Sequence, residues 1–581
     1  MDPDVLRVGN CSGFYGDRAA AMREMLEDGA LDVLTGDYLA ELTMLILARD
    51  RMKDPATGYA RTFLAQLDDC LSLALDRGVR LVANAGGVNP AGLVTAIEKM
   101  AARHGLTPRI ALVRGDDLTA RARDLGLGAP LGAHAYLGAF GIARALRAGA
   151  DIVVTGRVTD AALTVGPAIA RFGWDRTDLD ALAGATVAGH VIECGTQATG
   201  GNYAFFTEIT DPLRPGFPIA ELHRDGSSVI TKHPGTGGAV TVGTVTAQLV
   251  YEIGDARYAG PDVTARLDTV SLRQAGPDRV AVTGVRGEPP PPDLKVCRTA
   301  IGGYRNELTV VLTGLDIEAK AELFRRQFGA ACPTEPAEVT WTLARLDTAD
   351  AATEQQASAL LTVVARDPDE ARAGRAFTNA AVELALASYP GFFATTAPGG
   401  ARPYGVCTAG FVAQPVVAHE VVLPDGTVEQ VAAPAVTRPL EPLSGPDAPD
   451  AGPAGPARRL PLGTLAGARS GDKGGDANVG LWVRDAAAYP WLAALITEDT
   501  VRELLPEAAD LPVRVTRLPN LLAVNVVIDG LLGAGVAYQA RFDPQAKGLG
   551  EWLRARHVDI PESLLPDHLP AAPRPDDREL P

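Results

Sequence analysis

A small-residue, polar loop follows almost every apolar strand between Val5 and Asp160, and this arrangement constrains the fold more than any other feature. Helical patterns separate most of these strands, which favours right-handed crossovers and a parallel sheet. The carboxyl ends of parallel strands meet at one edge of a sheet, where ligands bind. The sequence therefore predicts one site built from the loops at residues 10–17, 35–37, 84–90, 114–117 and 155–160.

The chain has 581 residues, too many for a single hydrophobic core, so we expect several domains. Seven prolines crowd residues 434–456, which is typical of a linker. The fold class we predict is α/β, with a parallel N-terminal sheet. The predicted parts are a main domain (5–433) with a parallel α/β part (5–175) and an α+β part (176–433), a linker (434–458), a small, ferredoxin-like α+β domain (459–556) and a proline-rich tail (557–581).

Composition argues against several classes of protein. A net charge of −17 disfavours nucleic acid or an anionic membrane as a partner, because both require a basic surface. The six cysteines contain no CxxC spacing, so we expect no zinc ribbon or thioredoxin motif, and free thiols suit a reducing cytoplasm. We find no signal peptide, and no apolar run reaches the ~18 residues that span a bilayer.

Glycines in two of the loops allow backbone amides to approach a ligand closely. In the loop 10–17, Asp17 is predicted to cap the next helix, whose N-terminus favours an anion. In the loop 84–90, helix capping alone explains Asn89 but leaves Asn84 unexplained. Neither loop is a GxGxxG or a Walker motif. The sequence therefore favours other functions over those that use a dinucleotide or a nucleoside triphosphate.

Charged side chains in two further segments suit an anionic ligand. Arg157 would pair with a carboxylate or a phosphate, and Asp160 is either a base or the cap of the next helix. Residues 469–478 are predicted to form a polar, glycine-rich loop in which Arg469 and Lys473 would bind the same kinds of anion. The alternative for this segment is an exposed hairpin loop with paired charges.

A helix predicted over residues 178–196 carries His190, Glu193 and Cys194 on one face. These side chains would form an acid–base pair or a His–Cys pair, unless they are packed structural groups. Three such side chains can also hold a metal, but without a second cluster of donors we expect none.

The chain has long, specific motifs at residues 10–17, 84–90, 155–163, 189–201 and 234–252. These motifs make it similar to the AtuA family, the acyclic terpene utilisation proteins. Residues 469–478 resemble the AtuA-like C-terminal, ferredoxin-fold domain. The resemblance implies a role in bacterial breakdown of citronellol- and geraniol-like terpenes, alongside enzymes that act on branched acyl-CoA intermediates. It assigns no catalytic role to a particular residue.

Two functions of different kinds follow. The first is an enzyme with lyase, hydratase or thioester chemistry on a carboxylated or hydroxylated acyl-CoA, in which loop amides and Asn side chains stabilise an enolate or oxyanion. The second is a non-catalytic acyl-CoA-binding or scaffolding subunit. A nicotinamide oxidoreductase is weaker, because the dinucleotide fingerprint is missing. We expect a cytoplasmic homo-oligomer with no cofactor, binding a small molecule and neither nucleic acid nor a membrane.

The candidate residues have different expected roles. Cys194 is the candidate nucleophile, and Arg157 or Lys473 would bind a carboxylate or a CoA phosphate. The candidate catalytic residues are Asp160, His190, Glu193 and Cys194. The candidate ligand-binding residues are Asn10, Ser12, Gly13, Asp17, Asp37, Asn84, Gly86, Gly87, Asn89, Thr155, Gly156, Arg157, Gln197, Arg469, Ser470, Asp472 and Lys473.

Overall fold

The computed structural model describes residues 4–332, 334–441, 443, 446, 449 and 455–566, which form two compact units. Unit 1 comprises the described residues up to Thr299, Cys407–Val536 and those from Gln545 onward. Unit 2 comprises Ala300–Val406 and Ala537–Pro544. The predicted α+β part of the main domain therefore divides between the two units, a boundary that the mixed strand and helix pattern does not reveal.

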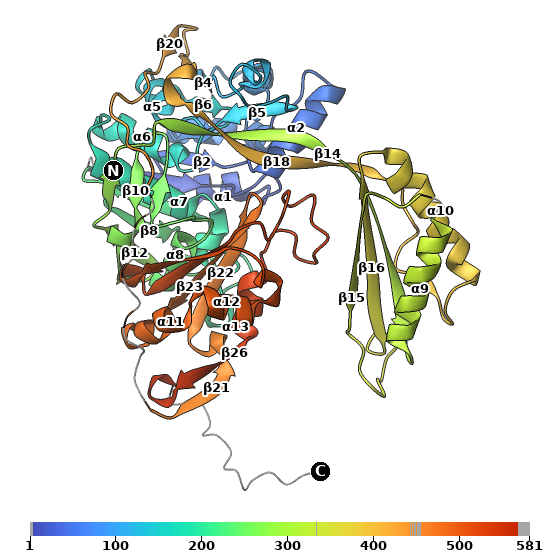
Figure 1. The fold of residues 1–581 in the computed structure, drawn as a ribbon. Helices are drawn as coiled ribbons and strands as arrows, with labels where there is room; N and C mark the ends of the chain where they lie inside the picture. The colour runs from blue at the N-terminus through green and yellow to red at the C-terminus, as the bar shows by residue number, and fades with distance from the viewer. Residues whose placement is uncertain are drawn as a thin grey trace. The chain divides into compact units, whose positions relative to one another are not determined.

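The large sheet of unit 1 confirms the parallel α/β fold (Figure 1). Its centre consists of five parallel strands, in the spatial order β1 (Val5–Asn10), β2 (Val33–Gly36), β3 (Arg80–Ala83), β6 (Ile152–Thr155) and β4 (Ile110–Arg114). Each of the five predicted loops follows one of these strands. Antiparallel strands extend the sheet: β7 (Pro218–His223), β8 (Ser228–Lys232), β12 (Arg279–Thr283) and β11 (Ser271–Gly276) beyond β1, and β19 (Glu420–Val422) and β20 (Val428–Gln430) beyond β4.

Helices cover both faces of the parallel strands, and the strand side chains alternate between two cores. In β6, Ile152 and Val154 belong to one core and Val153 to the other, and all three are fully buried. The first core includes side chains of α1 (Ala21–Glu27), α3 (Arg61–Arg77) and α4 (Pro90–Arg103). The second includes those of α5 (Phe140–Arg147), α6 (Ala162–Phe172), α7 (Leu179–Ile192) and α8 (Val242–Leu249).

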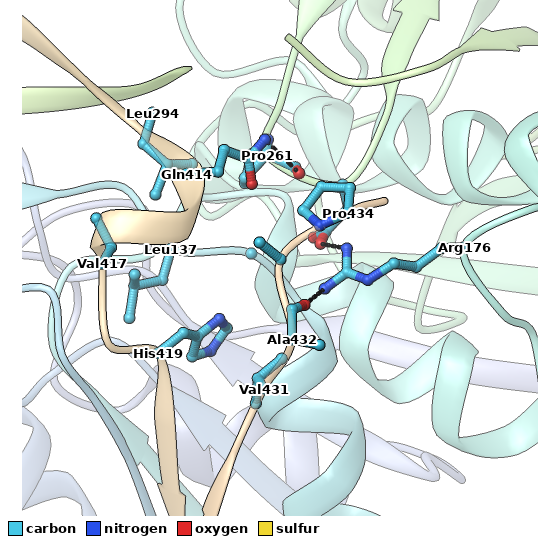
Figure 2. A pocket seen from close by; sticks show the side chains of 13 residues that line it. Leu137, Arg176, Pro261, Leu294, Gln414, Val417, His419, Val431, Ala432 and Pro434 are labelled. Carbon is cyan, nitrogen blue, oxygen red and sulfur yellow. Dashed lines mark hydrogen bonds and ion pairs between the residues drawn. The ribbon is translucent and has the colours of Figure 1, made fainter. Parts of the chain in front are cut away.

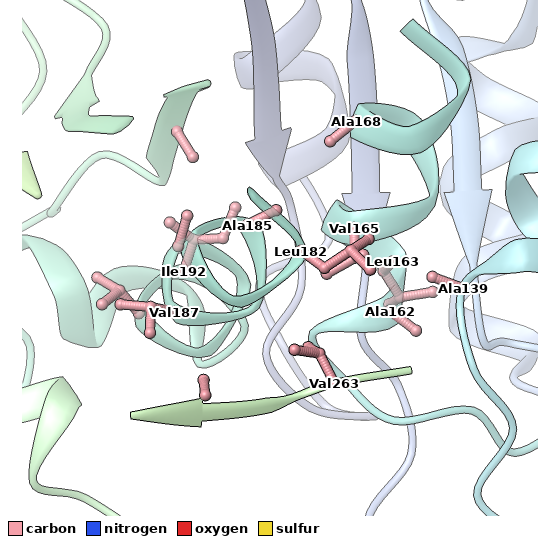
Figure 3. Close-up of a cluster of buried hydrophobic side chains, with 14 of the residues drawn as sticks. Ala139, Ala162, Leu163, Val165, Ala168, Leu182, Ala185, Val187, Ile192 and Val263 are labelled. Atoms are coloured by element: carbon pink, nitrogen blue, oxygen red, sulfur yellow. The ribbon is translucent and has the colours of Figure 1, made fainter. Parts of the chain in front are cut away.

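Helices α6 and α7 pack directly on each other in the second core. Figure 3 shows Leu163 and Val165 of α6 beside Leu182 of α7. Nearly every residue of α7 is buried, so the helix lies inside unit 1 rather than on its surface. A small sheet lies against α7, formed by β9 (Arg257–Ala259), β10 (Thr264–Arg266) and β13 (Arg286–Glu288).

Some local predictions are wrong in their details. Asp17 does not cap α1, which begins four residues later; its Oδ2 instead accepts a hydrogen bond from the Gly13 N–H at 2.9 Å. The helix predicted to continue to residue 196 ends at Ile192. Strand β5 (Gly132–Ala135) and α5 were not predicted, and β5 pairs with β14 (Asp293–Thr313) instead of joining the large sheet.

The C-terminal domain, residues 457–566, has a four-stranded antiparallel sheet. Its order is β22 (Ala466–Lys473), β23 (Asp476–Val483), β25 (Ala523–Ile528) and β24 (Val513–Leu518). Its helices are α11 (Tyr489–Leu495), α12 (Glu498–Leu504) and α13 (Leu549–Ala555). The hairpin β22–β23 contacts α8 of the main domain (Figure 1).

Two predicted boundaries change in this domain. Residues 469–478 are mostly strand and not a loop, with the turn confined to Gly474 and Gly475. Residues 557–561, placed in the predicted tail, form β26 (His557–Pro561), which pairs with β21 (Ala457–Pro461). The rest of the tail from 567, and much of the linker, lies outside the described residues.

Unit 2 contains a twisted antiparallel sheet covered on one face by helices (Figure 1). Phe324, Phe328 and Phe377 form the centre of its core, with ring centroids 5.1–5.8 Å apart for the two adjacent pairs. The strands are β15 (Glu338–Ala344), β16 (Ser358–Asp367), the later part of β14, β17 (Phe393–Ala394) and the first part of β18 (Arg402–Ala413). The helices are α9 (Ile317–Ala331) and α10 (Phe377–Glu383).

Helix α2 (Glu41–Lys53) completes the main domain. Among the described residues, none of the helices is both long and apolar enough to cross a membrane.

Candidate functional site

Asn10 joins the first loop to the C-terminal end of α7. Its Nδ2 donates to the carbonyl oxygens of Ile192 and Glu193, at 2.7 and 2.9 Å. Gly13 lies so close to Cys194 that a Cβ on the glycine would be 2.6 Å from the Cys194 carbonyl carbon. The first loop and the segment that follows His190 therefore lie against each other in the fold.

Asp37 and Asn84 link the ends of β2 and β3. Asn84 Nδ2 donates to Asp37 Oδ1 at 2.6 Å, and Asn84 Oδ1 accepts from the Tyr38 N–H at 2.8 Å. Both side chains are buried. Burial, followed by the charge of Asp160, raises the pKa of Asp37 well above its ordinary value. The loops after β2 and β3 thus place a carboxyl with weakened acidity at the sheet edge.

Arg157 and Asp160 form an ion pair after β6. Arg157 Nη1 donates to Asp160 Oδ1 at 2.9 Å and to the Leu39 carbonyl at 3.0 Å, and the guanidinium lies 4.3 Å from the centre of the Tyr136 ring. The Arg157 side chain is only 3% exposed, whereas that of Asp160 is 29% exposed. Arg157 is therefore held internally, and Asp160 is the member of the pair that a ligand can reach. Burial raises the pKa of Asp160 despite the neighbouring Arg157 charge.

His190 and Glu193 form a buried pair at the end of α7. His190 Nδ1 lies 3.0 Å from Glu193 Oε1, and the imidazole packs on the Tyr258 ring at a centroid distance of 4.7 Å. Burial lowers the pKa of His190 to about 4. Burial, followed by the Asp160 and Glu252 charges, raises the pKa of Glu193 well above its ordinary value. Both shifts favour the uncharged forms, a neutral imidazole beside a protonated carboxyl.

Glu193 Oε2 is buried and makes no hydrogen bond within the described residues. His190 Nε2 also lacks a hydrogen bond of regular geometry, although the backbone carbonyl of Gln248 acts on the ring. Both atoms therefore lack a hydrogen-bond partner among the described residues, which is typical of positions that water or a ligand satisfies.

Cys194 follows the pair but is a poor nucleophile in this environment. Burial, followed by the Glu193 and Glu252 charges, raises its pKa well above the ordinary value of a thiol. Because the thiolate is the reactive form, this environment favours the inert thiol.

Lys473 brings a cation to the site from the C-terminal domain. It lies on strand β22, and its Nζ donates to the Glu252 carbonyl at 2.7 Å. Desolvation, followed by the charge of Lys295, lowers its pKa. Its charge in turn acts on both His190 and Glu193. The C-terminal domain thus contributes a charge to the environment of the His190–Glu193 pair.

Neighbouring positions on the C-terminal hairpin have partners of their own. Arg469 lies 4.5 Å from the centre of the Tyr251 ring and donates to the Asn202 carbonyl at 3.1 Å. Asp472 Oδ1 lies 3.3 Å from Lys547 Nζ. Both side chains are therefore engaged within the protein.

Several other predicted ligand-binding residues have local structural partners. Asn89 caps α4 by accepting from the Gly92 N–H at 3.1 Å, which is the capping role that its position before Pro90 indicates. The other three are hydroxyls: Ser12 donates to the Phe14 carbonyl, Thr155 donates to the Gly156 carbonyl, and Ser470 accepts from the Gly550 N–H, at 2.9, 2.9 and 2.8 Å. Gln197 differs, because its buried Oε1 makes no hydrogen bond within the described residues.

The glycines of the loops after β3 and β6 allow the loops to pack on their neighbours. A Cβ on Gly86 would lie 2.4 Å from the Thr155 carbonyl oxygen, and one on Gly156 would lie 2.5 Å from the Asp116 carboxylate. Gly87 has a φ of +53°. These glycines are explained by contacts between loops, and no ligand is needed to account for them.

Three residues of the site were not predicted: Glu252, Tyr258 and Glu41. Glu41 accepts from the Tyr136 hydroxyl at 2.8 Å, and the charges of Lys295 and Arg157 outweigh its burial and lower its pKa to about 2. Glu252 lies two residues beyond the capping residue of α8, and Tyr258 lies on a three-residue strand. Periodicity carries no signal for either of these positions.

A small cavity lies elsewhere in unit 1, beside Arg176 and His419 (Figure 2). Its volume of about 20 Å³ suffices for one water and excludes an organic ligand. None of the predicted site residues lines it. Within the described residues, no group of three His, Cys, Asp or Glu side chains is arranged to hold a metal ion.

The fold and the buried carboxyl cluster define an α/β protein with a candidate ligand site at the carboxyl edge of its parallel strands, bordered by an α+β C-terminal domain. Residues 6–423 match the acyclic terpene utilisation family protein AtuA, and residues 460–559 match the AtuA ferredoxin-like domain. The chain therefore belongs to the AtuA family. A search of curated proteins finds no match.

Proposed function

We propose that this protein is an enzyme of acyclic terpene breakdown that transfers a proton at a branched acyl-CoA. The family match supports the terpene pathway, and the acyl-CoA substrate and the proton transfer are our inference. Hydration, dehydration and carbon–carbon cleavage next to a thioester all require such a transfer. The substrate class we propose is a carboxylated or hydroxylated branched acyl-CoA.

The observation that carries the proposal is the environment of Glu193. Burial and the neighbouring Asp160 and Glu252 charges raise the pKa of Glu193 well above its ordinary value, and enzymes use shifts in this direction to prepare a carboxyl for general acid–base catalysis. Its Oε2 lacks a partner, and Nδ1 of His190 orients the other oxygen.

Neighbouring groups suit the charge changes of such a reaction. The ammonium of Lys473 would stabilise the thioester oxygen as it gains negative charge, or bind a substrate carboxylate. Asp160, which is partly exposed, would accept a hydrogen bond from a substrate hydroxyl. Arg157 keeps Asp160 oriented through their 2.9 Å ion pair.

Deuterium exchange tests the proposal without knowledge of the complete reaction. The protein would be incubated in D₂O with 3-methylcrotonyl-CoA, isovaleryl-CoA or 3-hydroxy-3-methylglutaryl-CoA, and incorporation at carbon measured by mass spectrometry. We expect exchange with at least one thioester, reduced by at least about 100-fold in Glu193→Gln, because an acid–base residue contributes on this order. Glu98→Gln, at an exposed position of α4, is the matched control and should exchange normally.

The non-catalytic alternative makes a different prediction in the same experiment. Calorimetric binding of these thioesters, with no exchange above the protein-free rate, would identify an acyl-CoA-binding or scaffolding subunit. If the thioesters neither bind nor exchange, this substrate class is ruled out.

A further inference from the structure

We propose that Tyr136 is a positioning residue of the candidate site. Its ring supports the buried guanidinium of Arg157, and Arg157 in turn holds the carboxyl of Asp160 where a ligand can reach it. The role of Asp160 in catalysis rests on the proposed function. The positioning itself is a property of the folded protein and can be measured without a substrate.

Backbone hydrogen bonds anchor Tyr136 between strand β14 and the loop after β6. The Tyr136 N–H donates to the Lys295 carbonyl at 2.9 Å. The N–H of the next residue, Leu137, donates to the Arg157 carbonyl at 3.2 Å, and the Leu137 carbonyl accepts from the Thr159 N–H at 3.0 Å. The chain at Tyr136 is therefore fixed against the same loop that carries Arg157.

A direct ring contact joins Tyr136 to Arg157. The guanidinium carbon lies 4.3 Å from the centre of the ring, and both residues are buried. An aromatic face attracts a cation, and the attraction is stronger where water is excluded. Because Arg157 Nη1 also donates to Asp160 Oδ1 at 2.9 Å, an unbroken series of contacts runs from the ring to the partly exposed carboxyl.

The hydroxyl of Tyr136 fixes the ring independently of Arg157. It donates to Glu41 Oε1 at 2.8 Å, and Glu41 is the first residue of α2. Lys295 Nζ lies 3.5 Å from the same carboxylate oxygen and 4.8 Å from the centre of the ring. Contacts with α2 and β14 thus hold the ring in place, so that it provides a fixed surface for the guanidinium.

Two substitutions separate the ring face from the hydroxyl. Tyr136→Phe keeps the aromatic face and removes the hydrogen bond to Glu41, whereas Tyr136→Leu removes both. The measurement is the pKa of Asp160 in each protein. It is obtained from the protonated carboxyl band in the infrared difference between that protein and the same protein with Asp160→Asn, recorded over a series of pH values.

The expected result follows from the charges that act on Asp160. Burial raises the pKa of Asp160, the charge of Arg157 lowers it, and the charges of Glu41 and Glu252 raise it. Without the ring the guanidinium is free to move away, so its lowering effect weakens. An opposite charge in contact lowers the pKa of a carboxyl by about 1–3 pH units, so we expect Tyr136→Leu to raise the pKa of Asp160 by about one pH unit. Tyr136→Phe should leave it nearly unchanged.

Unit 2 contains a matched arrangement that serves as the control. The guanidinium carbon of Arg366 lies 4.0 Å from the centre of the Tyr538 ring, and the Tyr538 hydroxyl donates to Glu338 Oε2 at 2.8 Å. Tyr538→Leu removes the same kinds of contact and should leave the pKa of Asp160 unchanged. If Tyr136→Leu does not fold, Tyr136→Met replaces it, because methionine fills irregular spaces and has no aromatic face.

The proposal is overturned if the pKa of Asp160 is unchanged without the Tyr136 ring. It is also overturned if Tyr136→Phe raises this pKa as much as the variant without a ring, because the hydroxyl and not the ring face would then hold Asp160. An equal rise in Tyr538→Leu would likewise show that the effect is not specific to Tyr136. The measurement uses no thioester, so a protein that exchanges no deuterium would disprove the proposed function and leave this result standing.

Discussion

The unfolded chain ionises Glu193 at neutral pH, whereas folding raises the pKa of this carboxyl well above its ordinary value. A carboxyl with a raised pKa in the folded state stabilises the protein fully below the unfolded value of 4.5, and this contribution is lost as the pH rises toward the folded value. At neutral pH the burial of Glu193 therefore lowers the stability of the folded protein, a cost that functional sites commonly carry.

Glu193→Gln should consequently stabilise the protein while abolishing proton transfer. We expect the free energy of unfolding to increase by about 0.5–2 kcal/mol at pH 7.5, the usual range for removing such a functional group. Urea unfolding at pH 7.5 and at pH 4 would measure it, and the gain should disappear at pH 4. A loss of stability at pH 7.5 would show that the carboxyl serves mainly to hold α7 in place.

His190 has the opposite pH dependence. Its pKa falls from 6.5 to about 4 on folding, so its contribution to stability is present above pH 6.5 and is lost as the pH falls toward 4. The shift corresponds to about 3 kcal/mol. We expect His190→Asn to flatten the loss of stability between pH 6.5 and 4 in denaturant titrations.

His557, which is exposed, provides the control for the His190 variant. His557→Asn should leave the pH dependence unchanged. Burial also lowers the pKa of His419 to about 4. His419 therefore still contributes to the loss of stability at acid pH in the His190 variant. If His190→Asn loses as much stability between pH 6.5 and 4 as the unsubstituted protein does, the imidazole of His190 is not neutral and buried in the folded state.

At the scale of elements, the loops after the parallel strands are packed against one another and against the end of α7. A Cβ on Gly13 would lie 2.6 Å from the carbonyl carbon of Cys194, just beyond this helix end. Gly13→Ala should displace the loop and destabilise the protein by about 1–3 kcal/mol, as overpacking does. Thermal unfolding would show this loss of stability. Gly78→Ala is not a suitable control, because Gly78 has a φ of +67° and alanine would be strained there.

Gly329, in helix α9, offers a better comparison for Gly13→Ala. A Cβ on Gly329 meets no atom within 4 Å, and its φ is not in the left-handed region. Gly329→Ala should be neutral or slightly stabilising. If the two substitutions change the stability equally, the first loop accommodates the added methyl group at no cost in stability.

The elements that could be predicted from the sequence are those with strong local signals. Apolar strands followed by glycine and asparagine marked the sheet edge, and a spacing of three placed His190 beside Glu193. Glu252 escaped prediction because its conformation depends on side chains more than 200 residues away in the sequence. Residues 469–478 were predicted as a loop because their polar side chains face other protein groups and not solvent.

At the scale of the whole molecule, unit 1 joins the main domain and the C-terminal domain through a buried polar contact. Asn478 bonds to both Glu252 and Asn525. Asn478→Ala would leave buried partners unsatisfied and cost about 2–4 kcal/mol. Because the contact ties the two domains together, calorimetry should show one transition for unit 1, moved to lower temperature.

Unit 2 provides the comparison for this prediction. Asn306 is a buried asparagine there, and its Nδ2 donates to the carbonyls of Ala373 and Gly399, each at 3.0 Å. Asn306→Ala should shift only the transition of unit 2. If the main domain and the C-terminal domain of Asn478→Ala unfold in separate transitions, the prediction that they unfold together is wrong.

The protonation state of Glu193 is the central claim, and infrared difference spectroscopy tests it most directly. The spectrum of the unsubstituted protein minus that of Glu193→Gln would be recorded at pH 7, in H₂O and in D₂O. We predict a carbonyl band of a protonated carboxylic acid that shifts in D₂O. A difference spectrum that contains only carboxylate bands would show Glu193 to be ionised and would contradict the account.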